Sequence, residues 1–141
     1  MRITAFIILS FLFFSSFTAT PNSAESYELI LEAKGCHYRI VVNDNVVDEG
    51  KTYQRIEKTI LLKKELADSG EQKIDVSMFR ISREIPLKTT QAYLNLKLEK
   101  HLGDSVVLIK EVKLPTFPYD DDEVQPQSIA GSIQFELKTE E

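Results

Sequence analysis

The sequence is poor in the residues on which disulfides, metal sites and catalytic centres most often depend. It has no tryptophan, one cysteine (Cys36) and two histidines (His37 and His101) in 141 residues. A single cysteine excludes an intramolecular disulfide, so the fold has to rely on its apolar core. The chain also lacks a phosphate-binding loop, a dinucleotide fingerprint, a Gly-x-Ser-x-Gly motif and, beyond residue 24, any Asn-x-Ser/Thr site.

Cys36 and His37 are adjacent, which argues against a shared role in catalysis or metal binding. Neighbouring residues on a strand point to opposite faces. Cys36 shares its parity with Tyr38, Ile40 and Val42, which predicts a buried thiol. A nucleophilic cysteine would need a base beside it, and a zinc site would have to recruit carboxylates. The sequence therefore predicts a protein that is not an enzyme.

The first 24 residues have the order of a secretory signal peptide. Met1-Arg2 precedes an apolar run from Ile3 to Phe17, and small and polar residues follow it. We predict cleavage after Ala24, with Ala19 as the less favoured site. An uncleaved anchor is the alternative, but serines interrupt the run before the roughly 20 residues that a spanning helix needs. We therefore expect a secreted or periplasmic protein with no membrane span after cleavage.

Residues 25–141 are expected to form a single domain that follows the signal peptide at 1–24. This part holds 16 basic and 22 acidic side chains, which gives a net charge of −6. Its length is that of one domain, and it is sufficient to bury a core without disulfides. Nucleic acids and anionic membrane surfaces are bound by basic patches, so the acidic balance argues against both as partners.

Apolar and polar residues alternate with period two along most of the chain, as in half-buried strands. Turn residues separate these runs, and no convincing helical pattern is present; 63–68 is at most one helical turn. We predict an all-β fold, an antiparallel β-sandwich of seven to eight strands that is immunoglobulin-like or jelly-roll. The expected strands are 27–33, 36–42, 46–50, 59–62, 72–79, 92–100, 105–114 and 133–137.

Two hairpins are predicted from their turns. Asp44-Asn45 is expected to be a two-residue loop that places Val42 opposite Val47, because Asn and Asp tolerate turn conformations. A second turn, at 101–104, joins the strands on either side of it. The strand at 105–114 has apolar residues on both faces, which predicts a central or covered position.

The segment from Pro115 to Ser128 is predicted to be a long exposed loop, and it holds the candidate binding residues. Phe117 and Tyr119 form an aromatic pair on which a sugar ring could stack; packing within the loop is the alternative. The acidic run that follows could bind calcium through its oxygens, or it could be a solvated acidic loop without the spacing of an EF-hand. This run consists of Asp120, Asp121, Asp122 and Glu123.

Two resemblances accompany these patterns. The run Leu66-x3-Gly70-x3-Ile74-x-Val76 resembles the edge of jelly-roll and galactose-binding-like domains, where a strand follows a glycine turn. The chain from Tyr27-Glu28-Leu29 through Val42-Asn43-Asp44-Asn45-Val46 to the acidic loop is similar to small exported β-sandwich proteins of Bacteroidetes-type bacteria. The resemblance implies an exported β-sandwich. It carries over no ligand role, because the sugar- and calcium-binding residues of lectin-like relatives have no counterpart here.

Three functions are compatible with the sequence. The first is an exported non-enzymatic β-sandwich that binds a protein partner or a cell-envelope component such as a glycan. The second is a carbohydrate-binding accessory module that uses Phe117 and Tyr119. The third is a small hydrolase with unplaced carboxylates, since no pair can be chosen among 22 acidic residues without geometry. The missing catalytic constellation favours the first, with no cofactor expected beyond a loop calcium ion.

Overall fold

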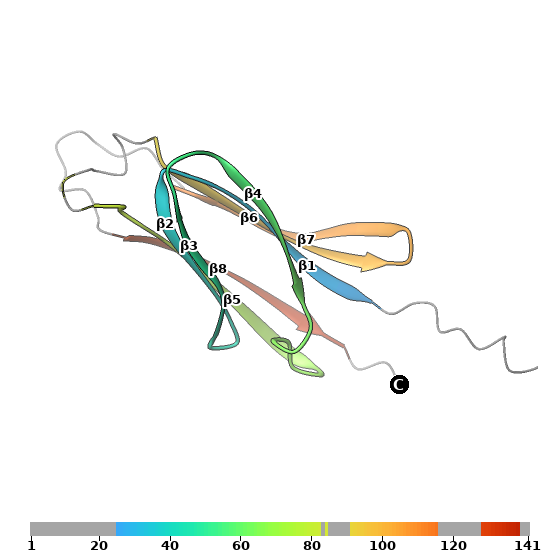
Figure 1. Ribbon diagram of the computed structural model, residues 1–141. Coiled ribbons are helices and arrows are strands. Elements are labelled where there is room, and N and C mark those ends of the chain that lie inside the picture. Colours follow the sequence, from blue (N-terminus) through green and yellow to red (C-terminus); the bar gives the residue numbers. More distant parts are fainter. Residues whose placement is uncertain (1–24, 83, 85–90, 116–127, 139–141) are drawn as a thin grey trace, which may run out of the picture.

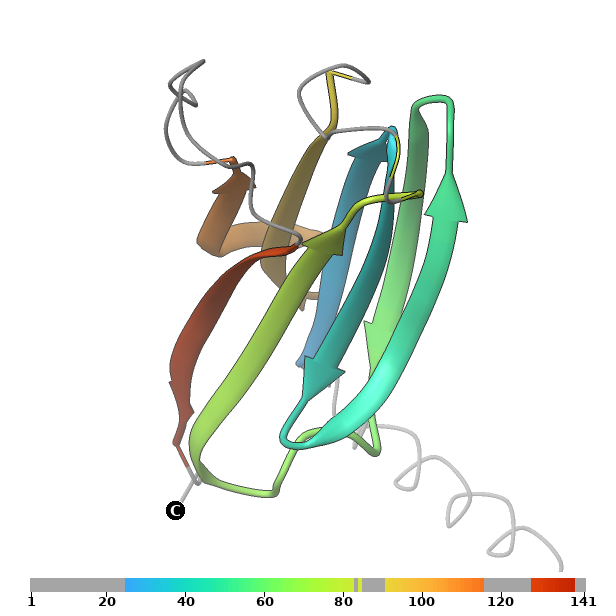
Figure 2. The same cartoon turned by 90° about the vertical axis from the view of Figure 1, so that its left-hand side faces the viewer.

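Eight strands form two antiparallel four-stranded sheets that pack face to face, which confirms the predicted all-β sandwich (Figure 1). The computed structural model describes residues 25–82, 84, 91–115 and 128–138. Sheet A has the strand order β4-β1-β6-β7, and sheet B, in front in Figure 2, has the order β3-β2-β5-β8. The strands are β1 (Ser26–Lys34), β2 (Cys36–Val42), β3 (Asn45–Thr52), β4 (Ile56–Leu62), β5 (Gly70–Phe79), β6 (Tyr93–Leu102), β7 (Ser105–Leu114) and β8 (Ser128–Leu137).

The two halves of the chain have the same topology. In the first unit, β1–β4, the β2–β3 hairpin lies in sheet B and the β1–β4 pair lies in sheet A. In the second unit, β5–β8, the β6–β7 hairpin lies in sheet A and the β5–β8 pair lies in sheet B. Exchanging the two units converts the strand order of sheet A into that of sheet B. The fold therefore has an approximate twofold relation between its two long, folded hairpins.

Both hairpins contain a β-bulge in the strand that follows their turn. Val47 is the extra residue in β3, between the pairs Ile40↔Asp48 and Val41↔Val46. In β7 the extra residue is Ile109, which lies between the pairs of Lys110 and Leu108 with β6. A bulge bends its strand and increases the local twist. Both extra residues pack against the core as a result, so Val46 and Leu108 occupy equivalent positions in the two units.

The core is built from the alternating inward residues that the sequence pattern indicates. Leu29, Leu31 and Ala33 of β1 are fully buried, as is Cys36 of β2, whose burial was predicted. Gly35 connects β1 to β2 across the two sheets in a left-handed conformation, with φ of 66°, which glycine adopts without steric cost. The remaining buried apolar residues are Tyr38, Ile40, Val42, Leu62, Ile74, Val76, Met78, Ala92, Leu94, Leu96, Leu98, Leu114 and Ile133.

Polar contacts close one side of the sandwich, where β3 and β4 are the edge strands. Lys58 of β4 pairs with the buried Leu31, so its side chain starts on the inner face. It makes an ion pair of 3.1 Å with Asp48 of β3, and the Tyr38 hydroxyl donates a hydrogen bond of 3.1 Å to the same carboxylate. An inward lysine at an edge therefore joins the two sheets here, which accounts for the one polar residue in the apolar parity of β4.

Several predicted boundaries and one register were wrong. The β2–β3 turn consists of Asn43 and Asp44, both with positive φ, so Val42 faces Asn45 instead of Val47. A two-residue hairpin of this kind needs positive φ at both loop positions. The side chain of Asn43 holds the turn at Asn43-Asp44 in place. The predicted strand at 133–137 begins at Ser128, because β8 pairs with β5 along its whole length.

Two further predictions concern a possible helical turn at 63–68 and the apolar segment at the start of the chain. The stretch at 63–68 is a series of turns and bends, not a helical turn. Within the described residues, the structure contains no helix with the length and apolarity required to cross a bilayer. The predicted signal peptide at 1–24 lies outside the described residues.

Candidate functional site

The outer face of sheet A gathers most of the polar side chains that neighbouring strands bring together. Side chains from paired residues lie on the same face of a sheet, so they form rows across β4, β1, β6 and β7. One row is Glu57–Glu32–Asn95–Lys113, the next is Thr59–Ile30–Lys97–Glu111, and the third is Leu61–Glu28–Glu99–Leu108. The exposed side of β6, with Asn95, Lys97 and Glu99, is therefore part of a larger four-stranded polar surface.

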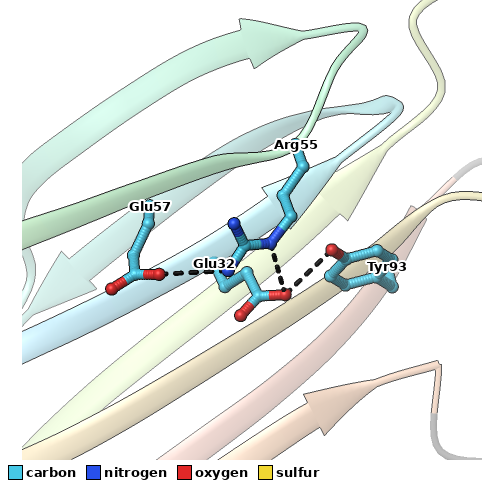
Figure 3. Close-up of polar contacts among 4 residues, drawn as sticks. All are labelled: Glu32, Arg55, Glu57 and Tyr93. Atoms are coloured by element: carbon cyan, nitrogen blue, oxygen red, sulfur yellow. Dashed lines mark hydrogen bonds and ion pairs between the residues drawn. The ribbon is translucent and has the colours of Figure 1, made fainter.

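Glu32 is the centre of a polar network at one end of this face (Figure 3). Its Oε1 atom accepts a hydrogen bond of 2.8 Å from the Tyr93 hydroxyl and one of 3.1 Å from Arg55 Nε. Arg55 extends to Glu57 through a second contact of 3.1 Å. The hydrogen bonds from Arg55 and Tyr93 lower the pKa of Glu32 below its ordinary value. Glu32 is thus held as a carboxylate, and its charge fixes the positions of Arg55 and Tyr93.

A shallow hollow of about 260 Å³ lies beside this network on the outer face. Glu32 and Glu57 line it from β1 and β4, and Lys97 and Glu111 line it from β6 and β7. Its charged groups are of both signs and face solvent. A general acid has a raised pKa, whereas the pKa of Glu32 is lowered, so this arrangement does not resemble the acid–base pair of a glycosidase.

A group of two carboxylates and one imidazole lies at the opposite end of the outer face. Glu28 of β1 is directly opposite Glu99 of β6, and His101 follows two residues later on β6. The His101 Nε2 atom is 3.1 Å from Glu28 Oε2 and 3.3 Å from Glu99 Oε2. About a quarter of each side chain is exposed to solvent. His101 was predicted to lie in the turn of the hairpin, but it is part of β6, because the turn is only Gly103-Asp104.

The β7 strand does not have the covered position that was predicted for it. It is an edge strand of sheet A, with β6 on one side and no described strand on the other. Three successive apolar residues, Val106, Val107 and Leu108, are 54%, 53% and 52% exposed. Leu102 at the end of β6 is also exposed. The apolar residues on both faces of β7, which suggested burial, are therefore open to solvent at the tip of the β6–β7 hairpin, which projects from the sandwich in Figure 1.

A larger hollow, of about 500 Å³, lies at the base of this hairpin. Tyr27 and Phe135, whose ring centroids are 5.6 Å apart, supply its apolar lining together with Ile109. Lys100 and Lys138 contribute positive charges to it, and Glu25 and Glu136 contribute negative ones. Lys100 is the partner of Val107 in the β6–β7 register. The inward-facing side of β7 at Val107 therefore lies next to this hollow.

The residues that the sequence singled out lie partly outside the described residues, and the others do not form a catalytic or metal-binding pair. Phe117, Tyr119, Asp120, Asp121, Asp122 and Glu123 lie outside the described residues. Cys36 is fully buried, while His37 is exposed and contacts Phe79. Burial raises the pKa of the Cys36 thiol to about 11, which is the opposite of what a reactive cysteine needs.

Comparison with family models, curated proteins and solved structures finds no match to this chain. Inferences about its function therefore come from the residues and the geometry described above.

Proposed function

We propose that this chain is an exported, non-enzymatic β-sandwich that binds a protein partner by adding a strand of that partner to β7. In this mode, an extended segment pairs with the backbone of an exposed sheet edge, and pockets beside the edge accept alternate side chains. The proposal concerns the edge of sheet A at the tip of the β6–β7 hairpin.

The observation that carries the proposal is the run of three exposed apolar residues on an edge strand. Exposed sheet edges present unpaired backbone groups, and proteins usually protect them with charges, prolines or short strands. The inner half of β7 carries such charges, at Lys110, Glu111 and Lys113, but its exposed end has Val106, Val107 and Leu108 in succession without a charge or a proline. A partner strand would cover this apolar surface and pair the free backbone groups.

The surroundings of β7 define the chemistry of the expected partner. The hollow at the base of the hairpin has the apolar surfaces of Tyr27, Ile109 and Phe135, so it suits one apolar side chain of the added strand. Beyond its apolar run β7 continues with Lys110, Glu111 and Lys113, and Lys113 makes an ion pair of 3.8 Å with Glu111. We therefore expect an extended segment with several apolar residues that is followed by polar ones.

Two features favour a binding module over the other candidate functions. The raised pKa of Cys36 and its burial do not suit a nucleophile, and Glu32 is held ionised by Arg55. Stacking of sugars usually needs several exposed rings, and among the described aromatic residues only Tyr53 is largely exposed. The carbohydrate-binding alternative rests on Phe117 and Tyr119, and it stays a prediction.

The proposal is tested by capturing partners from a cell-envelope extract with the purified chain as bait. Leu108→Lys places a charge at the end of the exposed apolar run next to the bulge, at a position that is already half exposed to solvent. We expect retention of the captured protein to fall at least about tenfold, since burying one lysine at such an interface costs more than about 1.4 kcal/mol.

Val46→Lys is the matched control, because Val46 has the equivalent position next to the bulge of the other hairpin and is also exposed. This variant should retain the partner as well as the parent chain does. Equal retention by all three proteins would contradict the proposal. It would also be contradicted if the captured species were a glycan or a second copy of this chain.

A further inference from the structure

The Glu28–Glu99–His101 group places two carboxylates directly opposite each other on neighbouring strands, with an imidazole beside both. Like charges that are directly opposite on neighbouring strands destabilise a sheet, and Glu28 and Glu99 are such a pair. Leu61 and Leu108 lie on either side of them in the same row. About three quarters of each carboxylate side chain is covered, so solvent screens their repulsion only in part.

The imidazole between the carboxylates is a second, independent observation. The Nε2 atom of His101 is covered by protein, and no hydrogen bond to it is formed. Its distances to Glu28 Oε2 and Glu99 Oε2 are short, at 3.1 and 3.3 Å, but neither contact has the geometry of a hydrogen bond. The imidazole nitrogen and the two carboxylates therefore lie close enough together to share one bound cation.

The two distances from His101 Nε2 to the carboxylate oxygens match those between neighbouring ligands of a tetrahedral metal ion. Zinc bonds of about 2.0–2.1 Å to nitrogen and oxygen place neighbouring ligand atoms about 3.3 Å apart. One donor atom from each of Glu28, Glu99 and His101 can be chosen so that all lie within 4.8 Å of one another. Calcium and magnesium prefer oxygen ligands, whereas zinc accepts imidazole and carboxylate together.

We propose that Glu28, Glu99 and His101 bind one Zn²⁺ ion, with water at a fourth position. The ion would neutralise the two opposing carboxylates and use the covered lone pair of His101. It would also connect β1 of the first unit to β6 of the second, so zinc should stabilise the folded chain by mass action. This inference is independent of strand addition at β7.

The test is calorimetric titration of the purified, chelator-treated chain with ZnCl₂. We expect one equivalent of zinc to bind and the melting temperature to rise with zinc concentration. His101→Gln should weaken binding by more than about 100-fold, because even the outer partners of metal ligands contribute about 10–100-fold. Glu99→Gln should weaken it as well, and it provides a second variant in case His101→Gln does not fold.

His37→Gln is the matched control, because it removes the other histidine of the chain, which is exposed and lies next to Cys36. It should bind zinc as the parent chain does. The nitrogen resonance of His101 Nε2 should shift on addition of one equivalent. Absence of stoichiometric binding, equal loss in His37→Gln, or an Nε2 atom that stays protonated in the presence of zinc would each overturn the proposal; the last result would identify the group as a simple ion pair.

Discussion

At the scale of single residues, the β2–β3 turn is stabilised by a buried polar network. Gln72 is fully buried, and its Oε1 atom accepts hydrogen bonds from Asn43 Nδ2 at 2.6 Å and from the amide of Ala67 at 2.8 Å. Asn43 also donates to the carbonyl of Glu65 and accepts from the amide of Lys73. Buried polar groups are stable only when they are paired, so this network fixes the turn against β5.

Asn43→Ala is predicted to lower the free energy of unfolding by about 3 kcal/mol, through lost hydrogen bonds and the cost of positive φ at a residue with a Cβ atom. Asn43→Gly loses the same hydrogen bonds but tolerates the turn conformation. It should therefore be about 1 kcal/mol more stable than Asn43→Ala. Denaturant unfolding measures both values, and equal stability of the two variants would show that the turn conformation is not limiting.

Cys36 is predicted to be chemically protected in the folded protein. Its thiol is fully buried, and burial raises its pKa from 9.0 to about 11, so little thiolate is available to react. A thiol reagent at pH 8 should label the unfolded chain rapidly and the native chain only through unfolding. For the same reason, stability should fall as the pH rises from about 9 to about 11, because the unfolded chain loses its thiol proton first.

The carboxylate of Glu32 should contribute to stability with the opposite dependence on pH. Hydrogen bonds from Arg55 and Tyr93 lower its pKa in the folded state from 4.5, so its contribution is complete above that value. The contribution is lost as the pH falls from 4.5 through the lower, folded pKa, because the unfolded chain takes up the proton first. Titration by carbon NMR should show the pKa of Glu32 returning towards 4.5 in Arg55→Met, and only part of the way in Tyr93→Phe. An unchanged pKa in Arg55→Met would show that this ion pair does not hold the carboxylate.

At the scale of elements, the side of the sandwich formed by β7 and β8 depends on a close approach at one glycine. A Cβ atom on Gly131 would lie 2.7 Å from Val112 Cγ1 and 3.4 Å from Leu114 Cδ2. Valine is stiff because it is branched at Cβ, so the methyl group cannot move away easily. The absence of a side chain at this position therefore allows β8 of sheet B to pack against β7 of sheet A.

Gly131→Ala is accordingly predicted to destabilise the protein by about 1–3 kcal/mol, as overpacked cores do. The cost should be much smaller in a Val112→Ala background, which removes the obstructing methyl group. A double-mutant cycle in denaturant measures this coupling. If Gly131→Ala had the same effect in both backgrounds, the contact with Val112 would not be its cause.

The elements whose pattern is set locally could be predicted from the sequence, and those that depend on distant partners could not. Alternation located β1, β2, β5 and β6 to within a few residues. The position of β7 could not be found in this way, because exposed valines at an edge have the same pattern as buried ones in a central strand. The meeting of Glu28 with His101 was missed for a related reason. It depends on the pairing of β1 with β6, and no local signal specifies that pairing.

At the scale of the whole molecule, the two hairpin units are related in topology but differ at their exposed ends. Both have a two-residue turn and a bulge, yet the β6–β7 hairpin continues for four paired positions beyond its bulge and the β2–β3 hairpin for two. The longer hairpin carries the exposed residues Leu102, Val106, Val107 and Leu108, whereas Val46 is the corresponding exposed residue of the shorter one. On the basis of this asymmetry we propose that the second unit is the binding end of the molecule.

The most direct test of strand addition is amide hydrogen exchange of the chain alone and in complex with its captured partner. Strand addition predicts that those backbone amides of β7 between Val106 and Leu108 that point away from β6 become protected in the complex, since they gain hydrogen bonds. The other edge strands, β3, β4 and β8, should exchange as they do in the free chain. Protection at one of those edges, with β7 unchanged, would contradict the proposed function.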